Sequence, residues 1–223
     1  LGFRNALYPL ADTLFQMDGV SLLMTVLIGL VAGVAGWLLI ALIGRSRRLF
    51  SRVRSLPLRL GAGGVAVGLL ALLSTDILGN GYEVIVKIIE GHYVITGLLL
   101  LLLLKTLATT LSVGSNAVGG LFTPSLLIGA LLGVILAQSA AALQLPVGDT
   151  LLYAAIGMAA VLAAVSQAPL MAMLMVLEMT LNSSLLFPLM IASVLASMVV
   201  YRLQSASTYP VVSHHLSRSE AWY

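Results

Sequence analysis

The sequence predicts an all-α, polytopic membrane protein with tilted and broken helices. Of its 223 residues, 60% are hydrophobic and 9% are charged, whereas a typical soluble domain has about 25% charged residues. The mean hydropathy is +1.10. Several apolar segments are too short to cross a hydrocarbon core of about 30 Å, and Gly, Pro or Ser residues join them in pairs. Helices broken in this way carry the binding sites of many transporters.

The composition excludes several classes of function. The chain has no Cys, and His92, His214 and His215 are too scattered for a zinc site, so we expect neither a metal nor a cofactor. The net charge of +3 comes from one local cluster, so we expect no nucleic-acid partner. The sequence also lacks an H-E-x-x-H pair, a G-x-S-x-G elbow and paired aspartates within its apolar segments, so we expect no enzyme.

The first half of the chain contains three expected spans. Residues 20–44 are long enough to cross a bilayer, residues 60–74 form a shorter second span, and residues 94–113 form a third. Between the first two spans lie six of the 11 Lys and Arg residues, from Arg45 to Arg59, and the positive-inside rule places them in the cytoplasm. A patch that binds lipid headgroups or nucleic acid is the alternative interpretation of these arginines.

Lys105 lies inside the third expected span. A charge at that depth costs at least ~2.5 kcal/mol on insertion scales and usually faces a protein interior or a transport pathway. A lysine that extends its ammonium group to the membrane interface is the other interpretation. The sequence leaves both open.

The remaining helices follow one another with turn residues between them. We expect Asp149 or Thr150 to cap the fifth helix, and Pro169 to separate the fifth from the sixth. These helices are expected at residues 121–143, 150–165, 169–180 and 185–203. The chain thus divides into a loop segment (1–19), a membrane domain (20–203) and a C-terminal tail (204–223).

Small residues recur four positions apart in three of the expected helices, a spacing that permits close helix packing. The pairs are Gly29 with Gly33, Gly64 with Gly68, and Gly129 with Gly133.

The run GSNAVGGLFTP interrupts two apolar segments at membrane depth. Gly114, Ser115, Gly119, Gly120 and Pro124 all disfavour a continuous helix there. If Gly120 is the N-cap of the next helix, the N–H groups of the first turn have no intrahelical acceptor, and the helix dipole adds positive charge. Backbone alone then forms an anion site, and the glycines leave no side chain in the way. A flexible hinge between two helices is the alternative interpretation.

This run resembles the GSGxxGGxFxP signature of the CLC chloride channels and chloride/proton antiporters. The segments GMAAVLAAVSQAPLMAMLMVLEMT and STYP resemble further family segments in the same order, so the resemblance covers about residues 20–216. It implies a chloride transport protein of bacterial type, a homodimer in the inner membrane, with chloride as substrate. Asn116 and Val118 depart from the signature, which usually has Gly at the first position and often Pro at the second.

The resemblance also implies roles for individual residues. The N–H groups of Leu121 and Phe122 match those that bind a central chloride in the family, and Tyr209 matches a tyrosine whose hydroxyl donates to the same ion. Without the resemblance, Tyr209 would be interpreted as an interfacial anchor. Glu178 matches a family glutamate within a membrane helix, for which we favour a structural carboxylate over a proton relay.

Two segments of the family's first half, a GSGIP-like one and a GREGP-like one with the gating glutamate, are not in this sequence. The resemblance therefore implies the second inverted repeat of the CLC fold, a fragment whose partner is the N-terminal half of the subunit. Channel and antiporter both stay open, because the glutamates that distinguish them belong to that half. A membrane scaffold that keeps the fold without transport is the alternative function.

The same resemblance implies which surfaces of this chain pack against other parts of the assembly. We expect residues 169–180 and 185–198 to face a second subunit, and the faces at Gly29/Gly33 and Gly129/Gly133 to be left uncovered by the missing half.

Overall fold

The computed structural model describes residue 15 and residues 17–53, 55–78, 81–89, 94–117, 119–149 and 151–206, and every regular element within them is helical. In chain order these are α1 (Gly19–Phe50), α2 (Leu56–Ala71), the 3-10 turn η1 (Thr75–Ile77), α3 (Tyr82–Ile89), α4 (Ile95–Gly114), α5 (Phe122–Ala142), α6 (Leu152–Ser166), α7 (Pro169–Thr180), the 3-10 turn η2 (Ser183–Leu185) and α8 (Leu186–Ala206). The all-α prediction is confirmed.

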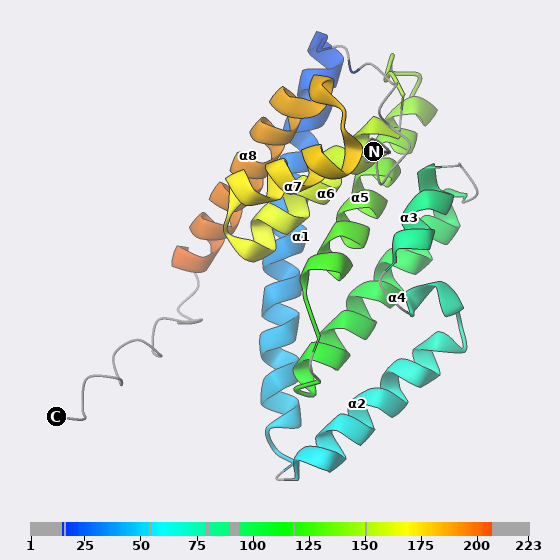
Figure 1. Ribbon diagram of the computed structural model, residues 1–223, viewed down its shortest axis with the longest axis vertical. Coiled ribbons are helices and arrows are strands. Elements are labelled where there is room, and N and C mark those ends of the chain that lie inside the picture. Colours follow the sequence, from blue (N-terminus) through cyan, green and yellow to red (C-terminus); the bar gives the residue numbers. More distant parts are fainter. Residues whose placement is uncertain are drawn as a thin grey trace, which may run out of the picture.

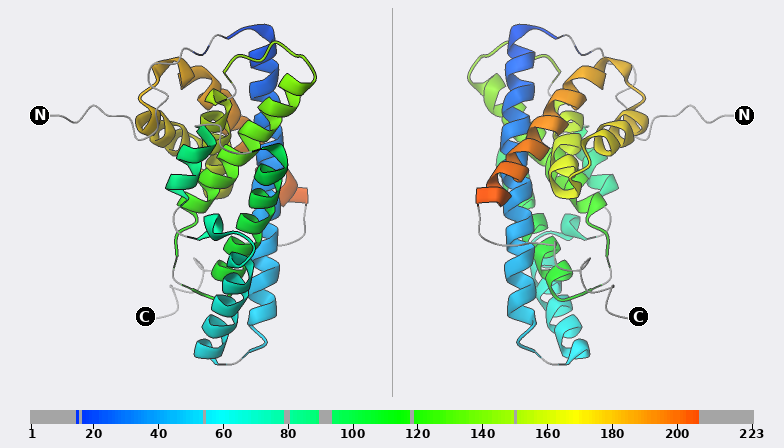
Figure 2. Two further views of the ribbon diagram at one scale, coloured as in Figure 1. Left: turned by 90° about the vertical axis from the view of Figure 1, so that its right-hand side faces the viewer. Right: turned by 90° about the vertical axis from the view of Figure 1, so that its left-hand side faces the viewer.

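The chain contains both long and short apolar helices, as the sequence predicts. Within the described ranges, four helical segments are long and apolar enough to cross a membrane: Gly19–Phe50, Ile95–Gly114, Phe122–Ala142 and Ser183–Gln204. The apolar helices α2, α6 and α7 are shorter. Figure 2 shows these helices crossing one another obliquely around the long α1 rather than standing parallel.

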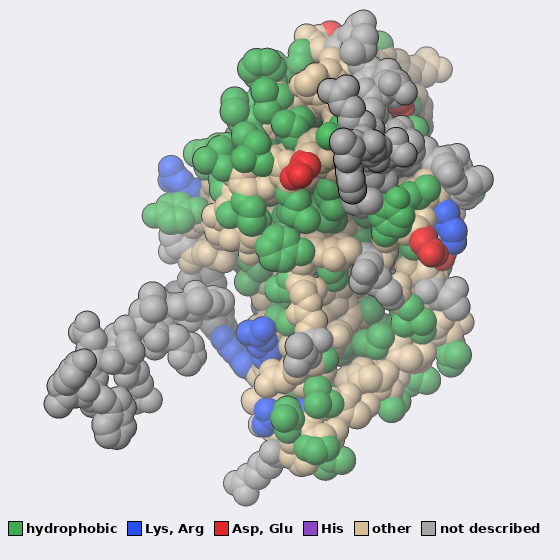
Figure 3. All heavy atoms as spheres, viewed as in Figure 1, with side chains coloured by type: hydrophobic (Ala, Val, Ile, Leu, Met, Phe, Trp, Pro, Cys, Tyr) green, Lys and Arg blue, Asp and Glu red, His purple; other side chains and the backbone are tan. Residues whose placement is uncertain are grey.

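Helix α1 runs along most of the length of the molecule (Figure 1). The sequence predicts its end at residue 44, but it continues to Phe50, so Arg45, Arg47 and Arg48 lie on its last turns. Arginine is a good helix former, and cations near a helix C-terminus interact favourably with the dipole. The arginine cluster is therefore helical in its first part. Figure 3 shows Lys and Arg side chains at this lower end of the molecule, and others on its left and right sides.

Helix α6 forms the centre of the bundle. Every residue from Leu152 to Ala164 is buried, and α1, α5, α7 and α8 all pack against it. A helix that is apolar on all sides requires such surroundings. The hydroxyl of Ser197 in α8 donates to the carbonyl of Ala163 at 3.1 Å and links α8 to this centre.

Two of the three predicted glycine pairs lie where backbones meet. A Cβ on Gly129 would overlap the carbonyl of Gly157, and a Cβ on Gly133 would overlap the carbonyl of Tyr153, so α5 and α6 touch backbone to backbone. Gly29 and Gly33 face α8 in a similar way. A Cβ atom on Gly29 would lie 3.1 Å from the Ala192 Cα. The packing prediction is confirmed for these pairs. The expectation that their faces are uncovered is wrong, because α6 and α8 of this chain cover them.

Helix α2 does have an uncovered side. A Cβ atom at Gly64 or Gly68 would have no described atom within 4 Å. Gly63 is the one residue of this helix that is described as buried. Among the described elements, α2 packs on α4 and η1 and leaves its outer side open. Its exposed apolar residues are Leu56, Leu58, Leu60, Val65 and Leu69.

Helix α7 has the predicted bounds, and the break before it has a clear cause. Gln167 ends α6 in the left-handed conformation (φ 56°), and Pro169 occupies the first turn of α7, where its missing N–H is tolerated. Glu178 is exposed on α7, and its carboxylate makes neither a hydrogen bond nor an ion pair within the described part of the chain. In this chain it is therefore not a buried structural carboxylate.

Candidate anion-binding site

Helix α4 ends just before the glycine-rich loop, and backbone hydrogen bonds cap its end. The N–H of Ser115 donates to the Leu111 carbonyl at 2.9 Å, and the N–H of Ala117 donates to the Ser112 carbonyl at 3.3 Å. Asn116 supplies the left-handed residue between them, with φ 67°. Asparagine is the residue that most often replaces glycine in this conformation. The departure from the family signature at this position is therefore compatible with the turn.

The end of α4 is held between two neighbouring helices. Gly114 lies so close to Ser46 of α1 that a Cβ at position 114 would overlap the serine hydroxyl. On the other side, a Cβ on Gly63 of α2 would overlap the hydroxyl of Ser115, which is buried and donates to the Ser112 carbonyl at 2.8 Å. Gly114 thus allows close approach, and the loop begins beside the arginine-bearing turns of α1.

From there the chain runs back to the middle of the molecule, where α5 begins (Figure 1). The structure places the N-cap at Leu121 (φ −87°, ψ −14°), one residue later than the predicted Gly120. The Ser125 N–H and hydroxyl both bond to the Leu121 carbonyl, at 3.1 and 2.6 Å, and close the first turn. Gly119 and Gly120 do not have a left-handed φ, so the backbone conformation at these positions does not require glycine. Both residues are exposed, with open space around them.

The first N–H groups of α5 remain available. The amides of Leu121, Phe122 and Thr123 have no intrahelical acceptor by position, and no side chain in the described residues caps the helix. Pro124 lacks the fourth N–H altogether. Leu121 is half-buried, whereas Phe122 is 45% exposed, so the start of α5 lies at an accessible edge. The positive end of the α5 dipole adds to this donor set.

A cavity of about 190 Å³ adjoins this helix start. Gly119, Gly120 and Pro124 line it on one side, and Lys105 of α4 lines it on the other. The Lys105 side chain is only 3% exposed, and its Nζ donates to the Ile77 carbonyl of η1 at 2.9 Å. Lys105 therefore faces the protein interior, and the interpretation that it extends to the interface is wrong.

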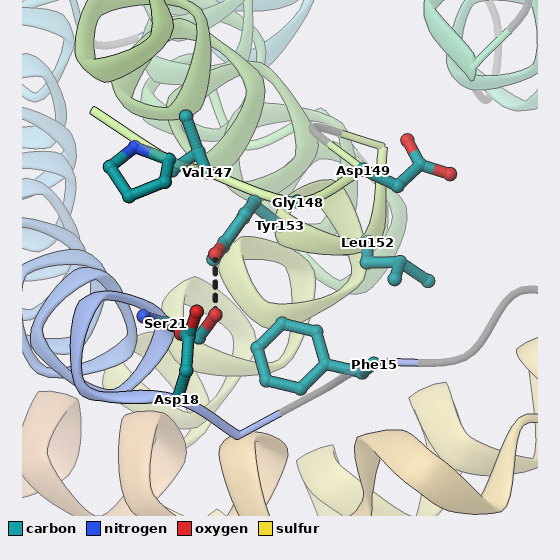
Figure 4. Close-up of a pocket in the computed structure, with 9 residues that line it drawn as sticks. Phe15, Asp18, Ser21, Val147, Gly148, Asp149, Leu152 and Tyr153 are labelled. Carbon is teal, nitrogen blue, oxygen red and sulfur yellow. Dashed lines mark hydrogen bonds between the residues drawn. The ribbon is translucent and has the colours of Figure 1, made fainter. Parts of the chain in front are cut away.

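A second cavity, of about 280 Å³, lies at the other end of α1 (Figure 4). The hydroxyl of Tyr153 donates to the Ser21 hydroxyl at 3.3 Å, and the Phe15 ring packs edge-on against the Tyr153 ring at 5.7 Å. The carboxylate of Asp18 accepts from the Ser21 N–H at 2.7 Å and caps α1. These contacts lie at the start of α1. This cavity is distinct from the candidate anion site, because the two cavities share no lining residue.

The structure thus brings Gly119, Gly120, Leu121, Phe122 and Pro124 together at one helix start, with Gly114 and Ser115 at the preceding helix end. Tyr209 and Val118 lie outside the described residues. Within the described ranges, no group of His, Asp or Glu side chains has a metal-binding arrangement.

Two residues near the site escape sequence reasoning, and a third is only partly predicted. Ser46 and Gly63 fix the end of α4 but carry no local pattern, because their roles arise from tertiary contact. The sequence marks Lys105 by its charge within an apolar segment, but its place beside the glycine loop depends on how α4 and α5 fold back on each other.

Comparison with protein families gives a match to the voltage gated chloride channel model over residues 3–201. A ClcB-like protein of Ralstonia nicotianae is 42% identical over 142 residues, which are 60% of this chain and 32% of that protein. The voltage-gated ClC-type chloride channel ClcB of Salmonella typhimurium is 40% identical over 116 residues, 52% of this chain and 28% of that protein. The matched segments thus span about a third of the length of these curated relatives.

Solved structures share the fold. A slow cyanobacterial Cl⁻/H⁺ antiporter superposes with a TM-score of 0.79 at 26% identity, over 90% of this chain and 48% of that one. A CLC-type fluoride/proton antiporter superposes with a TM-score of 0.73 at 23% identity, over 90% of this chain and 49% of that one. The second likeness concerns the fold alone.

Proposed function

The chain belongs to the voltage-gated chloride channel family, and on this premise we propose that it is the second half of a subunit that carries chloride across a membrane. The observation that supports this best is the start of α5, where N–H groups with no acceptor among the described residues lie beside a cavity. The family is one of chloride channels and not of enzymes. The described part of this chain has four helices long enough to span a bilayer, so this member of the family is an integral, multi-pass membrane protein.

The proposed chemistry uses neutral donors. A chloride ion that leaves water must replace its hydration shell, and the amides of Leu121 and Phe122 offer two N–H groups that are already oriented. The dipole of α5 adds favourable potential without a formal charge in contact with the ion. Such a site holds the anion long enough for selection and still releases it. Tyr209 would supply a hydroxyl as a third donor.

The proposed subunit has two parts. This chain covers 48% of the cyanobacterial antiporter, and its α2 carries an uncovered apolar side with small residues at Gly64 and Gly68. We expect the N-terminal half to pack against α2 and to complete the ring of donors around the ion. "Complete subunit" below means this chain joined to that half.

Dimerisation through α7 and α8 completes the proposed assembly. Both helices present a row of exposed apolar side chains: Leu170, Met171, Leu174, Phe187, Met190, Val194, Met198 and Tyr201. Such a surface faces either lipid or another subunit. We place the dimer in the inner membrane of a bacterium, because the similar chloride channel proteins are bacterial.

Chloride binding and flux by the complete subunit test the function. Calorimetry with chloride against gluconate should show chloride-dependent heat, and liposomes that contain the subunit should release chloride selectively. Measurement of proton uptake during release separates an antiporter from a channel. Binding without flux would favour the scaffold, and the absence of both binding and flux would refute the proposal.

A further inference from the structure

The cavity between α4 and the glycine loop contains a charged residue for which the backbone-amide site has no need. Lys105 shares this cavity with Gly119, Gly120 and Pro124, the residues that lead into the start of α5. Apart from Lys105, the described side chains that line the cavity are apolar or neutral. An anion bound at the α5 amides would therefore lie in the field of one nearby cation.

Burial makes this charge significant. Lys105 is 3% exposed within a membrane-spanning helix, and a charge at that depth is costly unless other groups compensate it. The Ile77 carbonyl accepts one of its N–H groups at 2.9 Å. Coulomb interactions are several-fold stronger at the effective dielectric of a protein than in water. A cavity of about 190 Å³ is also large enough to admit an ion with some of its water.

We propose that Lys105 sets the anion affinity of the α5 site, as a fixed positive charge that acts across the shared cavity without replacing the amide donors. This inference rests on the proposed function. The amides give the site its shape, and Lys105 gives it a bias toward anions over neutral molecules and cations. The hydrogen bond to Ile77 uses one of the ammonium N–H groups, and in this proposal the charge attracts the ion across the cavity rather than in a direct ion pair.

A purely structural role is the competing explanation, in which Lys105 only ties η1 to α4 through Ile77. Two substitutions separate the roles. Lys105→Gln keeps a donor for the carbonyl but removes the charge, and Lys105→Arg keeps the charge. Lys87→Gln is the matched control, because Lys87 is an exposed lysine on α3 that pairs with Asp76 at 3.4 Å and does not line the cavity.

Chloride titration calorimetry on the complete subunit decides between them, with thermal unfolding as the check on folding. We expect Lys105→Gln to weaken chloride binding about tenfold, and Lys105→Arg and Lys87→Gln to stay within about threefold of the unaltered protein. Equal affinity of Lys105→Gln and the unaltered protein would overturn the inference. So would an equal loss in Lys105→Gln and Lys105→Arg, because the charge would then not matter.

A second pair of variants covers the case in which Lys105→Gln does not fold. Ser112 lines the same cavity, so Ser112→Asp places a negative charge there while Lys105 remains, and Ser112→Asn is its neutral counterpart. We expect Ser112→Asp to bind chloride at least tenfold more weakly than Ser112→Asn, and equal affinities would contradict the proposal. If the unaltered complete subunit does not bind chloride at all, the proposed function itself fails, and that outcome is distinct from a change confined to the variants.

Discussion

Deletion of a single backbone N–H at the start of α5 is the sharpest test of the anion site. Leu121→Pro removes the N–H of the N-cap residue and keeps its carbonyl, which the Ser125 amide uses at 3.1 Å. The φ of Leu121, −87°, lies close to the −65 ± 15° of proline, and the preceding Gly120 tolerates the restriction that proline imposes. The helix should therefore still begin at the same place.

The expected loss follows from the nature of the bond. A hydrogen bond to a charged group contributes about 1.5–3 kcal/mol, which corresponds to an increase in the chloride Kd of about 10- to 150-fold. Leu121→Ala is the control, because it shortens the half-buried side chain but keeps the N–H. We expect its Kd to stay within about threefold of the unaltered protein, since its amide can still bind the ion.

Calorimetry with chloride on the complete subunit measures both variants, and circular dichroism verifies that helix content is preserved. If Leu121→Pro and Leu121→Ala bind chloride equally well, the amide at this position does not contact the ion, and the backbone site is wrong.

Four further predictions test the packing, the ion path and the topology. Gly133→Ala should lower the thermal stability of the complete subunit by about 1–3 kcal/mol through overlap with α6, whereas Gly44→Ala, with open space around it, should not; equal melting temperatures would contradict the backbone contact. Tyr209→Phe should weaken chloride binding about three- to tenfold by calorimetry, the equivalent of one neutral hydrogen bond, and unchanged affinity would return Tyr209 to the role of an interfacial anchor. Ser51→Cys should react with an impermeant thiol reagent from the cytoplasmic side only, and labelling of intact cells would reverse the topology. The hydrogen bonds from Ser21 lower the pKa of Asp18, so the charged cap stabilises α1 fully above the ordinary aspartate pKa. This stabilisation is lost as the pH falls through the lowered pKa of Asp18. The acid unfolding of Asp18→Asn should therefore depend less on pH, and identical pH profiles would exclude this role.

Local signals predicted helix types and breaks well. The bounds of α7 follow from Pro169 and from the turn residues after Thr180, and the short α6 follows from the break at Gln167. The overrun of α1 past residue 44 was missed because a run of arginines suggests a loop, although arginine itself favours helix. The N-cap of α5 was misplaced by one residue, since two consecutive glycines give no clear starting point.

Tertiary placement was not available from local patterns. Glycine spacing indicated close packing, but not that α8 and α6 of the same chain would cover Gly29 and Gly129. The burial of Lys105 was one of two open interpretations, because only the fold shows which way a side chain points from a membrane helix. The exposure of Glu178 likewise depends on which face of α7 meets the bundle.

The backbone contact between α5 and α6 has a consequence for the thermodynamics of ion binding. Because Gly129 and Gly157 bring carbonyl and Cα atoms into direct contact, α5 cannot slide or turn without the central helix moving with it. The helix that presents the Leu121 and Phe122 amides is thus part of a rigid body, and its donors are already in position for the proposed anion. Little conformational entropy is then lost on binding. Any large movement during the proposed transport must be located elsewhere, in side chains or in elements such as α2, whose outer side has no neighbour among the described helices.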